Sequence, residues 1–459
     1  MLKLFPPLPN VSLGPDASKR DIALDVIRAW SLLIVVFGHL FMEIIDWSSD
    51  IPYTGNTLSS GSNWPYVTWL LQVMPLFFVA GGAVNFGSYA RSTGTYNQWI
   101  WQRVKRLMKP TSVFLLTMCA AFTILTFTVD TQVTDALVSG VSGPLWFLSV
   151  YVLVTALTPL TSKWWQKNGL FSIFTLFVVA VLVDVVRLQV ASAAGVLNLI
   201  VIWVMVHQLG YWYSRGVQRN HAIMMIVVGL LNNFALTQVL KWYPTSLVGI
   251  PTEPISNMAP PTIVLMFHSI FLFGLFNLLA PKFKVWFARE RAFRITTHAG
   301  MLAMTIYLWH MSILVLWLSI LHRLNLDLPV QLLTAERSDG LRVLIVAPDG
   351  FPYWQGFLMS TICFGAILFV VVRNLWPLEF IKLPWFDTEP ERLSHSRIRS
   401  ITGVAMVSIG LLAVSGSGFS GFPFAVHEAF GFQLNTAYAI IAIFGGLGLL
   451  RQPSPAKSD

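Results

Sequence analysis

The chain alternates between long apolar blocks and short polar connections. Its Leu, Val, Ile and Phe residues gather in blocks of about 17 to 25 residues, the length that a helix needs to cross the hydrocarbon core of a bilayer. Because backbone polar groups in lipid have to be paired within the segment, these blocks are expected to be helices. The pattern predicts twelve spans, near residues 23–45, 66–89, 110–128, 145–160, 170–187, 195–212, 221–240, 262–280, 299–320, 355–372, 400–415 and 435–450.

Composition agrees with this pattern. Of the 459 residues, 55% are hydrophobic and 11% are charged, whereas a soluble protein has about a quarter of its residues charged. The sequence therefore predicts an all-α, polytopic transmembrane helix bundle.

The distribution of Lys and Arg predicts the orientation of the bundle, because cytoplasmic loops of membrane proteins are rich in these residues. With the N-terminus in the cytosol, the inner segments hold 24 of the 30 Lys and Arg residues and the outer segments hold 5, while Arg28 lies inside the first span. This asymmetry predicts a plasma (inner) membrane protein with a cytosolic N-terminus. It also explains most of the net charge of +9 as a face for membrane lipids or an anionic ligand, and no nucleic-acid partner is expected.

Metal and disulfide chemistry have little support in the sequence. Cys119 and Cys363 lie singly in two apolar spans, so no disulfide framework is expected. The His, Cys, Asp and Glu residues show no metal-ligand spacing, and no metal site is predicted.

The first span carries a polar face, which is costly inside a bilayer. At 100° per residue, Asp25, Arg28, His39 and Glu43 fall within an arc of about 60°. Arg28 and His39 are separated by about 16 Å along the helix axis, which is close to the reach of an extended pantetheine arm. Mutual neutralisation, of Asp25 by Arg28 and of His39 by Glu43, is the alternative explanation of this face.

Arg28 followed by ten residues and His39 in a first span resembles the signature of the acyltransferase-3 family of membrane-embedded O-acyltransferases. The segments Met74–Gly82 and Arg103–Pro110 resemble the second-span Phe-Phe segment and the basic Arg-x-x-Arg cytosolic turn of that family, and Leu145–Leu148 and Tyr307–His310 complete the set. Gly81-Gly82 with Asn85 resembles actinobacterial members. Tyr151 departs from the family, because many polysaccharide-modifying members carry a Glu at this position.

The resemblance implies a ten-helix core followed by about two further helices. The expected organisation is a cytosolic N-terminal segment (1–21), a membrane acyltransferase core (22–376), a cytosolic linker (377–399), a C-terminal transmembrane hairpin (400–451) and a tail (452–459).

A thioester donor and a hydroxyl acceptor need a base and a phosphate site. His39 is the expected general base, and Glu43 is expected to orient its ring. His310 lies at a similar depth and is a candidate second catalytic group or oxyanion donor, although an interhelical hydrogen bond explains it equally well. Phosphates of acyl-CoA are expected to meet Arg28, Arg103 and Arg106, together with Lys105 and Lys109, although anionic lipids also require basic residues on this side.

These features predict an O-acyltransferase that carries an acyl group, expected to be acetyl, from cytosolic acyl-CoA to a hydroxyl of an extracytoplasmic glycan, glycolipid or secreted metabolite. The outer segments Tyr243–Pro261 and Leu321–Gln355 are expected to shape the access of this acceptor. The alternative is a proton-coupled transporter or flippase, which also has several spans and ionisable groups in mid-membrane.

Overall fold

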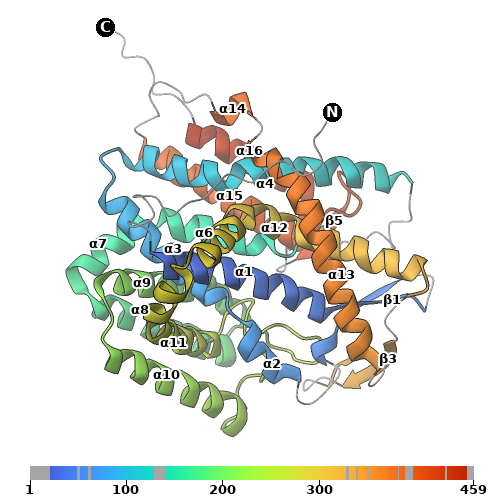
Figure 1. Cartoon of the computed structure of the whole chain (residues 1–459), viewed down its shortest axis with the longest axis horizontal. Helices are drawn as coiled ribbons and strands as arrows, with labels where there is room; N and C mark the ends of the chain where they lie inside the picture. The colour runs from blue at the N-terminus through green and yellow to red at the C-terminus, as the bar shows by residue number, and fades with distance from the viewer. Residues whose placement is uncertain are drawn as a thin grey trace.

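In the part of the chain that the structure describes, the protein is a bundle of helices with three small antiparallel β-hairpins, and Figure 1 shows how the helices are arranged. The computed structural model describes residues 21–48, 52–59, 64–128, 140–326, 330–336, 340–348, 352–380, 382–387, 396–429 and 432–451. Its helices are α1 (Ile22–Met42), α2 (Trp64–Leu71), α3 (Met74–Ala90), α4 (Tyr96–Thr126), α6 (Leu145–Ala156), α7 (Thr158–Asn168), α8 (Leu170–Gln189), α9 (Asn198–Arg215), α10 (Arg219–Phe234), α11 (Ile263–Phe287), α12 (Glu290–Arg323), α13 (Pro352–Leu375), α14 (Pro384–Asp387), α15 (Arg397–Ser417) and α16 (Thr436–Arg451). The shorter helical turns are η2 (Thr57–Ser59), η3 (Ser192–Leu197), η4 (Ala235–Val239) and η5 (Trp376–Phe380).

Each of the twelve predicted spans overlaps a helix. Among the described residues, ten helices are long and apolar enough to cross a membrane, or eleven if the pair α6–α7, bent by 56°, counts as one span. The twelfth predicted span is the shorter apolar helix α16. The protein is therefore a multi-pass membrane protein, as its hydrophobic pattern predicted.

Two predicted boundaries were wrong in a way that affects the site. The first helix ends at Met42, because Glu43–Asp46 (β1) leaves the helix and pairs with Tyr53–Asn56 (β2). The Arg103–Lys109 segment is not a turn, because α4 begins at Tyr96 and runs through it to Thr126. A capping box in which Thr95 and Gln98 exchange hydrogen bonds starts α4 about four helical turns before the predicted span 110–128.

The remaining hairpins join Val330–Glu336 (β3) to Arg342–Pro348 (β4) and Val426–Ala429 (β5) to Phe432–Asn435 (β6). The sequence pattern had predicted none of the three hairpins. Of the predicted soluble segments, 1–20 and 452–459 lie outside the described residues, as do 381 and 388–395 within the linker.

Helix α1 lies at the centre of the bundle and packs on α3, α11, α12 and α13 (Figure 1). Its first turn is capped by the Asp21 carboxylate, which accepts from Ala23 N–H at 3.1 Å. Next to it, α3 and α9 pack closely, since a Cβ on Gly82 would lie 1.9 Å from the carbonyl oxygen of His207. Such small-residue crossings allow membrane helices to approach each other closely.

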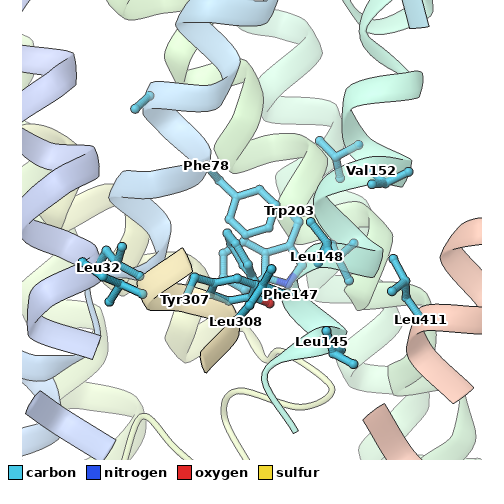
Figure 2. Packing of buried hydrophobic residues seen from close by; sticks show 14 of the residues in the cluster. Leu32, Phe78, Leu145, Phe147, Leu148, Val152, Trp203, Tyr307, Leu308 and Leu411 are labelled. Atoms are coloured by element: carbon cyan, nitrogen blue, oxygen red, sulfur yellow. The ribbon is translucent and has the colours of Figure 1, made fainter. Parts of the chain in front are cut away.

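An aromatic cluster fixes the core beside α1. Figure 2 shows Phe78 of α3, Phe147 of α6, Trp203 of α9 and Tyr307 of α12 meeting at one point. The rings of Phe78 and Trp203 stack with centroids 4.2 Å apart, and Phe147 contacts both Phe78 and Tyr307 edge to face. These ring contacts hold the four helices together beside the cavity, which Phe147 and Tyr307 line.

Candidate functional site

A cavity of about 840 Å³ runs beside α1. Arg28, near the start of α1, and Glu43, just after its end, both line it, so the cavity follows the helix for about 22 Å. His39 lies on the wall between them. The volume is in the range of cavities that hold a cofactor-sized ligand.

One end of the cavity is basic. Arg28, Lys105, Arg106 and Lys109 all contribute to its lining. Arg28 also lies over the Phe77 ring, with 6.0 Å from its guanidinium carbon to the ring centroid. Because α4 is a helix through this region, its three cations are presented within little more than one turn.

Arg103 is placed differently from the other predicted donor-binding residues. Its guanidinium donates to the Ser88 hydroxyl and lies 5.8 Å from the Trp99 ring centroid, and it does not contribute to the described cavity wall. It therefore joins α4 to α3 behind the cavity, next to Arg106.

His39 and His310 meet in mid-cavity although they are 271 residues apart in sequence. Nδ1 of His39 lies 2.9 Å from Nε2 of His310. The two ring planes differ by 10° and their centroids are 5.1 Å apart, a separation that fits two rings joined edge to edge by this bond.

The partners of His310 determine which nitrogen carries each proton. Nδ1 of His310 lies 2.8 Å from the carbonyl oxygen of Tyr307 and 3.2 Å from that of Ile306, and a carbonyl oxygen can only accept. Nδ1 of His310 is therefore an N–H donor, and in the neutral ring Nε2 accepts from Nδ1–H of His39. His39 is left with its lone pair on Nε2.

Glu43 lies where α1 gives way to β1. Glu43 is the C-cap of the helix, and its backbone N–H donates to the carbonyl oxygen of His39 one turn earlier, while the chain after it becomes extended. Nδ1 of His39 is bonded to His310. Glu43 lines both the large cavity and a second cavity of about 180 Å³, which also touches Thr54, Gly140 and Met311. The carboxylate thus lies in the wall between two cavities.

The end of the large cavity opposite the cations is uncharged apart from Glu43. It is formed by Asn56, by Thr68 and Gln72 at the break between α2 and α3, and by Val248, Gly249 and Met258 of the α10–α11 connection. The predicted acceptor segment Tyr243–Pro261 therefore reaches the cavity.

That connection is held in place by hydrogen bonds from neighbouring helices. The Asn257 amide donates to the carbonyl oxygens of Pro244 and Ser246 at 2.8 Å each, and the Trp69 indole donates to that of Thr245 at 2.9 Å.

The buried ring of His268 forms a hydrogen bond with the carbonyl oxygen of Gln72 at 2.9 Å, so this histidine fixes the break between α2 and α3. Sequence reasoning missed the α2–α3 break and the role of Gln72, although Pro75, in the first turn of α3, is the signal that would have found the break.

Tyr151 lines the cavity above Gly81. A Cβ on Gly81 would lie 2.7 Å from the Tyr151 ring, so the glycine makes room for the tyrosine. The residue pair explains how a bulky ring stands at the position where many family members were expected to carry a carboxylate.

Comparison with known proteins identifies the core. The model of the acyltransferase-3 family, described as an acyltransferase domain, matches residues 21–372. Neither the curated proteins nor the solved structures include a match. The matched residues begin at the cap of α1 and end within α13, and α14 to α16 lie beyond them.

Proposed function

The chain belongs to the acyltransferase-3 family and is a membrane acyltransferase, and we propose that it transfers an acetyl or other short acyl group from cytosolic acyl-CoA to a hydroxyl of an extracytoplasmic glycan, glycolipid or secreted metabolite. The observation that carries this proposal is the continuity of one cavity, which joins a cluster of four cations to the His39–His310 pair. An acyl-CoA donor matches this cavity, because it carries phosphates at one end, to meet the cations, and its reactive thioester carbon at the other, to meet the histidine pair.

The basic end of the cavity is proposed to bind the phosphates of the donor. Three of its cations lie on one stretch of α4, and Arg28 stands at the entrance of the path along α1. Guanidinium and ammonium groups bind phosphate through charge-assisted hydrogen bonds. The count of inner and outer Lys and Arg residues supports a cytosolic location of this end, where acyl-CoA resides.

His39 is proposed to act as the general base. The lone pair on Nε2 takes the proton of the acceptor hydroxyl while the hydroxyl oxygen forms a bond to the thioester carbonyl carbon. The carbon–sulfur bond then breaks, and the leaving sulfur takes the proton from Nε2. The products are the ester and free CoA thiol, and His39 regains its starting state.

The uncharged end of the cavity is proposed to admit the acceptor. The amide of Asn56 and the carboxylate of Glu43 suit a hydroxyl-rich ligand. Thr68 and Gln72 instead fix the wall, because both form hydrogen bonds with the backbone of Leu247. Glu43 is then positioned to contact the acceptor rather than to orient His39, because His310 already occupies Nδ1 of His39.

The donor site is tested by replacing cations that line the cavity. We expect Arg106→Ala to weaken binding of acyl-CoA by about ten-fold, since one charge-assisted hydrogen bond is lost. Arg103→Ala is expected to lower the thermal stability more than the affinity, because its guanidinium joins α4 to Ser88 of α3. Titration calorimetry measures the acyl-CoA affinity of both purified variants, and thermal denaturation measures their stability.

Lys167→Ala, which removes an exposed cation of α7 away from the cavity, is the matched control. Unaltered affinity in Arg106→Ala, or an equal loss in Lys167→Ala, would show that these cations serve only orientation and lipid contact.

The overall reaction is tested in cells. Mass spectrometry of envelope glycans, envelope lipids and secreted metabolites is expected to show an acetyl or short acyl increment that disappears when the gene is deleted and returns on complementation. Identical spectra in the presence and absence of the gene would remove the proposed acceptor class.

A further inference from the structure

The chain continues beyond the family match into a segment that reaches the basic end of the cavity. This mouth segment consists of the described residues of Trp376–Asp387, that is η5, residues 382 and 383, and α14. Phe380 of η5 contributes to the cavity wall. Asp387, at the end of α14, accepts hydrogen bonds from Nζ of Lys109 at 3.0 and 2.8 Å through its two carboxylate oxygens.

The mouth segment is anchored at both sides. Trp385 lies 6.1 Å, centroid to centroid, from Trp101 of α4, and the ring of Phe386 is parallel to Trp101 within 4°. The guanidinium of Arg451, the last residue of α16, lies 5.1 Å from the centroid of the Trp385 ring. The segment thus contacts both α4 and the end of the C-terminal hairpin, and Figure 1 shows α14 next to α16.

The hairpin is itself bound to the core. The Ser149 hydroxyl of α6 donates to the carbonyl oxygen of Ser408 at 2.6 Å, and the Ser415 hydroxyl of α15 donates to that of Gly143 at 2.6 Å. Side-chain hydrogen bonds of this kind join neighbouring helices in an apolar environment. The two extra helices therefore hold the mouth segment at a fixed place on the core.

We propose that Asp387 sets the affinity for the donor by occupying Lys109 in the empty enzyme and releasing it when a donor phosphate arrives. The inference rests on the proposed donor site and adds to it a role for the C-terminal extension. Lys109 is the residue that joins the two, because its side chain lines the cavity and also pairs with Asp387.

Three observations support the transfer of Lys109 from Asp387 to a donor phosphate. The Asp387 side chain is 32% exposed, so water and salt reach the carboxylate and weaken its ion pair with Lys109. Carboxylate and phosphate compete for the same ammonium group, and the phosphates also meet Lys105 and Arg106. Hydrogen bonds from Lys109 and from the N–H of Leu383 lower the pKa of the Asp387 carboxyl, so Asp387 remains an anion at neutral pH.

The test measures binding of CoA to the full-length protein in detergent micelles. Asp387→Asn is expected to lower Kd by roughly two- to five-fold at low salt, and the gain is expected to shrink at high salt. The amide keeps an oxygen for the N–H of Leu383, which donates to Asp387 at 2.8 Å, so α14 is expected to keep its turn.

Two further variants show whether the effect runs through Lys109. In a Lys109→Gln background, Asp387→Asn is expected to give no gain in affinity. Glu290→Gln, which removes an equal charge from the first turn of α12, is expected to leave Kd unchanged. Unchanged or weaker CoA binding in Asp387→Asn, or an equal gain in Glu290→Gln, would overturn the inference, whereas absence of CoA binding by the unaltered protein would overturn the proposed function itself.

Discussion

Replacement of His39 by alanine is expected to lower the rate of acyl transfer by about 10²- to 10⁴-fold, which is the usual contribution of a positioned general base. Binding of acyl-CoA is expected to remain nearly intact, because the cations that line the basic end of the cavity lie away from His39, with Arg28 about 16 Å along α1. Release of the CoA thiol in the presence of acceptor measures the rate, and calorimetry measures donor affinity. The combination of lost turnover and kept affinity distinguishes a base from a donor-binding residue.

His221→Ala is the matched control for this variant. His221 lies on α10, where its ring is 5.8 Å from the Trp212 centroid, and it contributes to neither described cavity. Normal turnover in His39→Ala would remove the proposed base, while a parallel loss of CoA affinity would assign His39 to the donor site.

The polar face of the first helix was readable from the sequence, because helical periodicity is local. His39 is eleven positions after Arg28 on a continuous helix, and both residues line the cavity as that spacing suggested. Glu43 caps the helix and lines the same cavity, but the periodicity says nothing about where a helix gives way to a strand. The chain leaves the helix at Glu43 because β1 pairs with β2. Helical periodicity does not reveal this pairing, since β2 begins only at Tyr53.

The basic residues of α4 show a second limit of sequence reasoning. Their charge placed them at the inner side of the bundle, but charge does not distinguish a solvated turn from the first half of a long helix. The capping box at Thr95 is the signal that would have found the helix start. Which cation faces the cavity depended on tertiary contacts, as the bond from Arg103 to Ser88 shows.

The C-terminal extension and the histidine pair are the features furthest from what sequence pattern can reveal. Asp387 and Lys109 are 278 residues apart, and His39 and His310 are 271 apart. Both contacts arise from packing of distant helices, and the tautomer of His39 follows only from the carbonyl oxygens that His310 meets on its own helix.

The role of His310 is best tested by comparing two substitutions of similar size. His310→Leu removes the acceptor for Nδ1–H of His39, leaves that donor unpaired in an apolar site, and frees the ring to adopt the other tautomer. We therefore expect turnover to fall by about 100-fold, the lower end of the range for a positioned base, with donor affinity unchanged. In His310→Gln the side-chain amide oxygen is able to accept the same hydrogen bond, so turnover is expected to recover to within about ten-fold of the unaltered protein. Thiol-release assays on both variants, with CoA binding as the check on folding, decide the matter: equal losses in the two variants would show that His310 only packs between helices, because a purely structural role gives glutamine no advantage over leucine.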